Sequence, residues 1–137
     1  MFNQDVVYHD TDLGWPEPFV FILFNIEILA DLGASVIKIE SLEGDISRQS
    51  HPARSPGMGQ TFLNSNRNKR SVSVDFSKPA GRDILKRIAA KCDVLIENYK
   101  VGDLAKHGLD YASLKAVCPS LIYCSVTGYG QDGPYAP

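Results

Sequence analysis

The sequence predicts an α/β fold in which a mostly parallel sheet carries helices on both faces. Two observations predict this class. Short β-branched or apolar runs alternate along the chain with segments whose apolar residues recur at helical spacing. Residues 93–97 also have an almost continuous apolar centre, which is typical of strands buried on both faces of a parallel sheet. The 137 residues have the size of one ordinary domain.

The first expected elements are a helix that ends near Gly33 and a strand over residues 36–40. Glycine is frequent just past helix C-termini, and a β-branched run directly after a helix predicts a strand. Residues 41–56 are rich in Ser, Gly, Pro and charge, so they predict a loop. Residues 71–75 alternate between apolar and polar and predict a second strand. The pattern predicts no strand before residue 28.

The second half of the chain repeats the alternation. Ser77 is expected to cap a helix that has Pro79 in its first turn. The third strand is expected at residues 93–97. Two short helices over residues 104–107 and 111–117 and a fourth strand over residues 121–126 then complete the pattern.

Composition excludes several classes of protein. With 44% hydrophobic residues and a formal net charge of -2, the chain can build a core and is predicted to bind neither nucleic acid nor a membrane surface. Its most apolar stretch, which begins at Phe19 and is interrupted by Glu27, is shorter than the ~20 residues of a membrane span. The three cysteines form no CxxC pair and the histidines have no ligand spacing, so a reducing compartment and no metal site are expected.

Polar residues follow the expected strands at their carboxyl ends. They are Glu40, residues 75–77, residues 98–100 and residues 127–130. In a parallel sheet these ends meet at one edge, where ligands of such folds bind. A ligand site is therefore expected there, although loops are polar in any protein and an ordinary loop edge is an equal alternative.

Several ordered blocks resemble the class III CoA-transferase family. The first is LADLGASVIKIE at residues 29–40, and Gly44-Asp45 followed by Arg48 comes next. Three longer blocks follow in the same order, at residues 64–83, 92–111 and 119–136. Members of this family include formyl-CoA transferase, the carnitine CoA-transferases and the racemase of 2-methylacyl-CoA thioesters. The most similar branch moves CoA between succinate and glutarate-like acids, such as hydroxymethylglutarate.

The resemblance implies a Rossmann-like sheet that forms an incomplete, N-terminal part of the family fold. Residues 1–27 are then an atypical N-terminal segment and residues 28–137 a partial CoA-binding domain. The implied activity moves CoA between carboxylic acids through an enzyme-bound anhydride and thioester. Acyl-CoA and a small carboxylic acid are the implied substrates, with no tightly bound cofactor. Family members are interlocked homodimers, and the implied location is intracellular, mitochondrial for a eukaryotic member of the dicarboxylate branch and otherwise cytoplasmic.

The family's CoA-contacting positions can be carried over to this sequence. They are Val74, Asp75, Phe76, Ser77, Asn98, Tyr99, Lys100, Lys106, Lys69 and Arg70. Phe76 would supply apolar area against the adenine, with a core position as the alternative. Lys69, Arg70 and Lys106 would supply charge to phosphates, with a solvated charged loop as the alternative for the first two.

The resemblance assigns no catalytic residue to this chain. The family's nucleophile is an aspartate that would align after Pro137, and Asp132 precedes that position. The sequence has three alternatives to a transferase. A fragment of a racemase of the same fold and a non-catalytic truncated isoform remain open. A dinucleotide-binding domain is the least favoured alternative, because the glycines at 128, 130 and 133 follow the fourth strand rather than the first and have the wrong spacing.

Overall fold

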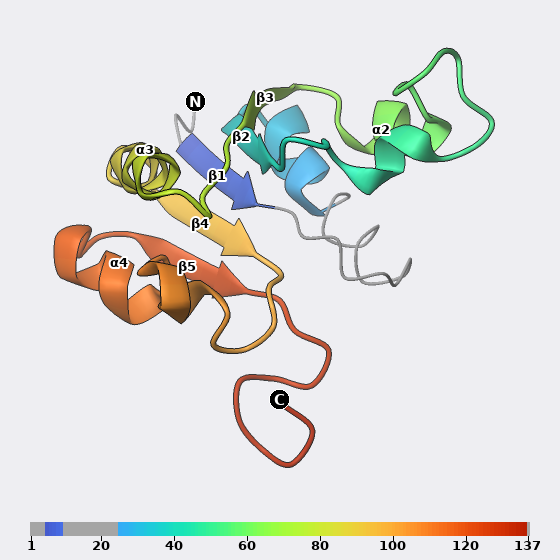
Figure 1. The fold of residues 1–137 in the computed structure, drawn as a ribbon. Helices are drawn as coiled ribbons and strands as arrows, with labels where there is room; N and C mark the ends of the chain where they lie inside the picture. The colour runs from blue at the N-terminus through green and yellow to red at the C-terminus, as the bar shows by residue number, and fades with distance from the viewer. Residues whose placement is uncertain (1–4, 10–24, 137) are drawn as a thin grey trace.

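The structure is a computed structural model, and it describes residues 5–9 and 25–136. Its centre is one parallel sheet of five strands in the order β3-β2-β1-β4-β5 (Figure 1). The strands are β1 (Asp5–His9), β2 (Ser35–Glu40), β3 (Lys69–Ser73), β4 (Val94–Glu97) and β5 (Ile122–Ser125). This sheet confirms the predicted α/β class. Of the predicted strands, the second begins and ends two residues earlier than expected.

The central strand β1 lies where the sequence pattern predicts no strand, so that prediction is wrong. β1 pairs in parallel with β2 on one side and β4 on the other, with Val6 beside Val36 and Val94. Five residues suffice for a strand here, because neighbours on both sides satisfy its backbone groups. That stabilisation comes from residues distant in sequence, so the short local run gives little signal.

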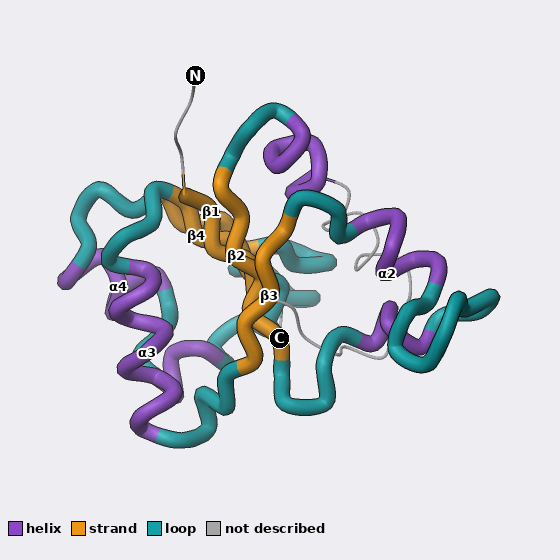
Figure 2. The backbone as a smooth tube through the Cα atoms, turned by 90° about the horizontal axis from the view of Figure 1, so that it is seen from above, coloured by secondary structure: helices purple, strands orange, loops and turns teal. Residues whose placement is uncertain are grey.

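The helices lie on both faces of the sheet, as predicted. They comprise the helical residues 25–31, η1 (Ile46–Gln49), α2 (Gln60–Ser65), α3 (Pro79–Ala89), η2 (Leu104–His107) and α4 (Tyr111–Val117). Figure 2 shows α3 and α4 on one side of the strands and α2 on the other. Gly33 follows the first helix with a φ of 98°, as expected of a helix terminator. None of the described helices has the length and apolar composition needed to cross a membrane.

One predicted helix cap is wrong. Lys78 occupies the N-cap position of α3, and no side chain there caps the helix. Ser77 instead donates from its backbone N–H and its hydroxyl to Oδ1 of Asp75, at 3.0 and 2.5 Å. The helix can start without a side-chain cap because Pro79, its first residue, has no N–H to satisfy.

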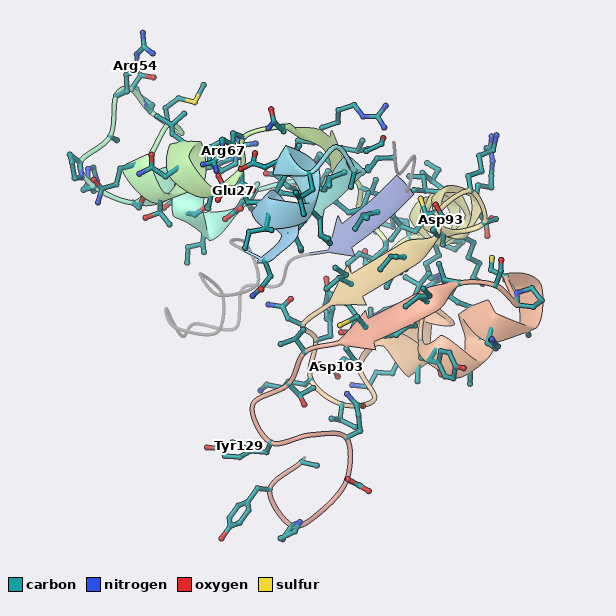
Figure 3. The ribbon with its side chains drawn as sticks, turned by 180° about the vertical axis from the view of Figure 1, so that it is seen from behind. Glu27, Arg54, Arg67, Asp93, Asp103 and Tyr129 are labelled. Atoms are coloured by element: carbon teal, nitrogen blue, oxygen red, sulfur yellow. The ribbon has the colours of Figure 1, made fainter. Side chains whose placement is uncertain are left out.

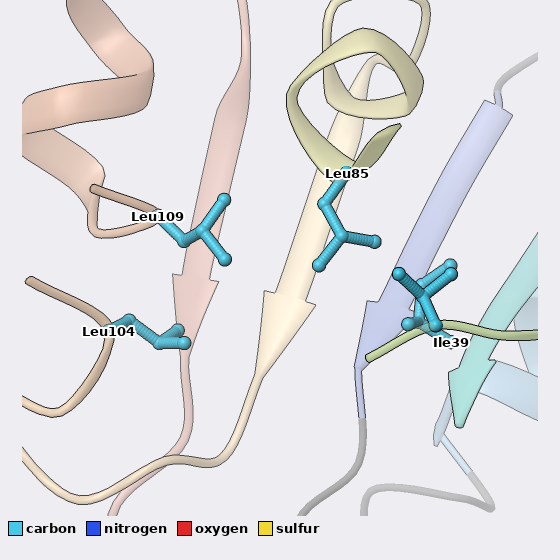
Figure 4. Close-up of a cluster of buried hydrophobic side chains, with 5 residues drawn as sticks. Ile39, Leu85, Leu104 and Leu109 are labelled. Atoms are coloured by element: carbon cyan, nitrogen blue, oxygen red, sulfur yellow. The ribbon is translucent and has the colours of Figure 1, made fainter. Parts of the chain in front are cut away.

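Each face of the sheet has its own buried cluster. On one face, Ile26 of the first helix packs against Val6 and Val36. On the other face, Ile39 of β2 packs with Leu85 of α3 and with two leucines from and just after η2 (Figure 4). Val36 and Ile39 are three residues apart on one strand, so they point to opposite faces. The two-sided core is what makes this sheet a rigid base for a site at its edge.

A buried polar network fixes the segment between β2 and β3, of which residues 41–56 were predicted to be a loop. Lys38 is 1% exposed, forms an ion pair with Asp45 and donates to Oδ1 of Asn66 at 3.1 Å. Asp45 also caps η1 by accepting the backbone N–H of Ser47 at 2.7 Å. Buried charges of this kind are stable only when they are paired. The network therefore holds η1 and the end of α2 against the sheet.

Candidate functional site

The strand order places a topological switch point between β1 and β4. The chain runs outward from β1 through β2 to β3, crosses back over the sheet, and continues outward through β4 to β5. Strand β1 ends at His9 and β4 ends at Glu97, and these two residues are register partners. Open parallel sheets bind ligands outside the carboxyl ends of the strands at such a point. The predicted ligand edge thus coincides with the edge that the topology favours.

Aromatic side chains from three segments meet near this edge. The ring of Phe76 lies edge-on to the ring of Tyr99, with centroids 5.8 Å apart, and to the ring of His107, with centroids 5.2 Å apart. Phe76 is half-buried and packs against the core cluster that contains Leu85. Phe76 thus contributes to the core, as one of the two alternatives expects, and its half-buried position leaves the adenine role a prediction.

The turn at residues 75–77 follows β3 and is ordered by its own side chains. The carboxylate of Asp75 accepts both hydrogen bonds from Ser77 described above. The hydrogen bond from the Ser77 side chain is the main reason that the pKa of Asp75 is lowered. Val74, just before this turn, is buried and donates its N–H to the Glu40 carbonyl at 3.0 Å. The backbone of the turn is thus held in place beside the rings.

A second turn, residues 98–100, follows β4. Asn98 is 4% exposed, whereas Lys100 is exposed. The backbone N–H of Tyr99 donates to Oε2 of the buried Glu97 at 2.7 Å. Burial raises the pKa of Glu97, although hydrogen bonds from the Ser125 side chain and the Tyr99 backbone act in the opposite direction. This turn lies directly at the switch point.

Lys106 presents its charge at the surface of η2. Its side chain is 71% exposed, and Nζ lies 2.6 Å from Oδ1 of Asp103. Hydrogen bonding to Lys106 is the main cause of a lowered pKa for Asp103. An exposed pair of this kind is weak, so an anion with more charge can replace the aspartate as the partner of the lysine. Figure 3 marks Asp103 in the segment that follows the 98–100 turn.

A cleft of about 580 Å³ lies beside the 98–100 turn. It is open to solvent between η2, the start of α4 and the end of β5, and its lining includes Tyr99, Lys100, Leu104, Tyr111, Tyr123 and Ser125. Cavities of a few hundred cubic ångströms with mainly apolar walls and a few polar groups are the size that holds small ligands.

The structure does not bring Lys69 and Arg70 to this edge. Both lie at the amino end of β3, where Lys69 is roughly 13 Å and Arg70 roughly 10 Å from the carboxyl end of the strand. Nζ of Lys69 donates to the Ser65 carbonyl at 2.6 Å, and Arg70 donates to Oγ of Ser35 at 2.7 Å. The neighbouring Arg67 forms ion pairs with two acidic residues of the first helix, one of which is Glu27 (Figure 3). The cations at positions 67, 69 and 70 therefore all bind partners within the protein.

The glycine-rich segment after β5 leads away from the sheet. Gly130 has a φ of 86°, and the ring of Tyr129 is 75% exposed (Figure 3). The side-chain amide of Gln131 donates to Oγ of Ser125 at 2.7 Å, which ties the segment to the end of β5. This hydrogen bond holds part of the segment near the end of β5, while Tyr129 projects into solvent.

Two residues of this site were not predicted as site residues from the sequence. The ring of His107 lies edge-on to that of Phe76, and its Nδ1 is 3.3 Å from Nη1 of Arg82. Glu97 was read only as the last residue of a strand. A carboxylate that ends an otherwise apolar strand is a usable signal, because such a residue must find hydrogen-bond donors when it is buried.

Comparison with known proteins agrees with this geometry. The family model for CoA-transferase family III matches residues 12–137. A crystal structure of a CAIB/BAIF family protein from Brucella suis superposes with a TM-score of 0.85 at 44% identity, over 97% of this chain and 34% of that one. The chain belongs to CoA-transferase family III.

Two curated relatives are CoA-transferases named for succinate and glutarate. The succinate–glutarate CoA-transferase of Agrobacterium fabrum is 45% identical over 117 residues, which are 80% of this chain and 29% of that protein. The succinyl-CoA:glutarate CoA-transferase of Mus musculus is 47% identical over 107 residues, 77% of this chain and 24% of that protein. The chain thus spans between 24% and 29% of the length of these relatives.

Proposed function

We propose that this chain is the CoA-binding portion of an acyl-CoA:carboxylate CoA-transferase that acts on dicarboxylic acids of the succinate and glutarate class. The names of the relatives support the reaction type and the acid class. The observation that carries the binding role is the meeting of Phe76, Tyr99 and His107 beside the switch point, with exposed lysines on the same edge.

Each part of the edge has a proposed partner in CoA. The accessible part of the Phe76 ring and the backbone of residues 75–77 would hold the adenine. Lys100 and Lys106 would bind phosphate oxygens with charge-assisted hydrogen bonds. Asn98 and Tyr99 would contact the chain that leads to the thioester, near Gly130.

The transfer itself is not assigned to any residue described here. In the proposed reaction, CoA leaves one acyl group and is joined to another carboxylic acid, and the chain contributes binding and orientation. As part of the same proposal, the whole protein is a dimer within the cell, in mitochondria if the source is eukaryotic and in the cytoplasm otherwise. Acyl-CoA and a small carboxylic acid are its substrates, and it holds no resident cofactor.

Calorimetric titration with CoA tests the binding role. Replacing Lys106 or Phe76 by alanine is expected to weaken CoA binding by roughly three- to tenfold, since each change removes one phosphate or adenine contact. Arg70→Ala is the matched control, because Arg70 is an exposed cation on the same sheet but at the opposite end of β3. A folded wild-type chain that does not bind CoA would reject the proposal, and equal losses in all three variants would reject the location.

A further inference from the structure

We infer that Glu97 is a positioning residue that holds two loops of the CoA site in one arrangement, an inference that rests on the proposed function. Glu97 is the last residue of β4, and it is 4% exposed. It lies beside β1 at the switch point, between the 98–100 turn and the end of β5. No ligand contact is required of it in this role.

The first loop is held through the backbone of Tyr99. Oε2 of Glu97 accepts the Tyr99 N–H at 2.7 Å, so the side chain of one residue fixes the backbone two positions later. A hydrogen bond to an ionised acceptor is stronger than one between neutral groups. This bond sets the direction in which the chain leaves β4, and with it the directions of the Asn98 and Lys100 side chains.

The second loop is held through Ser125. Ser125 is the register partner of Glu97 on β5, its side chain acts to lower the pKa of Glu97, and its Oγ accepts from the side-chain amide of Gln131 at 2.7 Å. The backbone agrees with this link, since the N–H of Val126 donates to the Glu97 carbonyl at 2.8 Å. Glu97 therefore binds the 98–100 turn directly, through its carboxylate, and reaches the glycine-rich segment at residues 127–133 indirectly, through Ser125 and Gln131.

A contribution to fold stability does not by itself explain why a carboxylate occupies position 97. Burial raises the pKa of Glu97, which means that the surroundings disfavour its charge. Burial of the phenol raises the pKa of Tyr123, and the charges of Glu97 and Asp110 raise this pKa further. The exposed Lys100 lines the same cleft as Glu97. Replacement of a buried ionised group by a well-packed neutral one is often neutral or stabilising, so a role in placing the loops explains the residue better.

The test combines calorimetry with amide NMR of the ligand-free chain. Glu97→Ala is expected to weaken CoA binding by roughly tenfold or more, measured at a temperature where the variant is fully folded. Glu97→Gln keeps one acceptor oxygen for the Tyr99 N–H and is expected to bind within about threefold of wild type. The exposed Glu43→Ala is the matched control and is expected to leave the affinity unchanged.

NMR separates this inference from the proposed function, because it needs no ligand. Glu97→Ala is expected to shift the amide signals of both Tyr99 and Gly130, and Ser125→Ala those of Gly130 alone. If the wild-type chain does not bind CoA, the proposed function fails while these signals still decide whether Glu97 couples the loops. Unchanged Gly130 signals in both variants, or a Glu97→Ala affinity equal to that of the Glu43→Ala control, would overturn the inference.

Discussion

Two buried carboxylates, Glu40 at the end of β2 and Glu97 at the end of β4, have pKa values shifted in opposite directions. Glu97 has a raised pKa because burial outweighs its hydrogen bonds. At Glu40, burial would also raise the pKa, but hydrogen bonds from Arg48 and Ser71 and the charges of Arg48 and Lys38 outweigh it, so the pKa is lowered. Arg48 binds both oxygens of Glu40, at 2.8 and 2.9 Å. Glu40 thus stays ionised and its side chain holds the loop after β2, while its backbone carbonyl accepts the N–H of Val74 beside the 75–77 turn.

The lowered pKa of Glu40 predicts an acid-sensitive contribution to stability. A folded pKa below the unfolded value of 4.5 stabilises the fold above about pH 4.5, and this contribution is lost as the pH falls through the folded pKa. Glu40→Gln is therefore expected to be less stable than wild type at pH 7, and to lose less stability than wild type as the pH falls from 4.5 through the folded pKa of Glu40.

Urea denaturation at a series of pH values measures this difference. The exposed Glu43→Gln serves as the control, because it removes a carboxylate that makes no described hydrogen bond. Parallel pH profiles for wild type and Glu40→Gln would contradict the assigned role of Glu40.

At the scale of elements, α3 approaches the 75–77 turn closely enough to require a glycine. A Cβ at Gly81 would overlap with the carbonyl oxygen of Asp75 and come within 3.1 Å of Cα of Phe76. The obstacle is backbone, which cannot rotate away as a side chain can. Gly81 therefore lets the first turn of α3 press against the turn that is proposed to hold adenine.

Gly81→Ala is expected to destabilise the chain by about 1–3 kcal/mol, as overpacking does, even though alanine is the better helix former by about 1 kcal/mol. The change should also weaken CoA binding, because the Asp75–Phe76 backbone must move. Ala80→Gly, at the neighbouring exposed position of α3, is the control and should cost no more than about 1 kcal/mol without an effect on CoA. Thermal unfolding of both variants checks this, and a stabilised Gly81→Ala would refute the close approach.

The sequence predicted elements whose stability is largely local, and it failed where distant residues decide. α4 and β2 were predicted within one residue of their observed bounds, because periodicity and flanking glycine are local signals. β1 was missed because its stability comes from pairing with strands more than twenty residues away. The six-residue helix α2 was missed because it depends on the buried Lys38, whose partners lie in two other segments.

The same distinction applies to the site. The rule that ligands meet the carboxyl ends of parallel strands correctly selected the 75–77 and 98–100 turns as neighbours of one edge. The cations at 69 and 70 precede a strand, so they lie at its amino end, and the resemblance alone gave no indication of that separation. His107 was missed because its contact with Phe76 depends on how η2 folds back against α3.

For the whole molecule, the central claim is that CoA binds at the carboxyl edge of the sheet, beside the switch point between β1 and β4. Amide NMR of the labelled chain during titration with CoA tests this claim most directly. We expect the shifted signals to gather at residues 75–77, 98–100 and 104–107, with those of Lys69 and Arg70 nearly unchanged. Shifts that gather instead at the amino end of β3 would contradict this location. The absence of shifts in a folded chain at millimolar CoA would also contradict it, because even a weak site with a free energy of binding of about −4 kcal/mol would respond at that concentration.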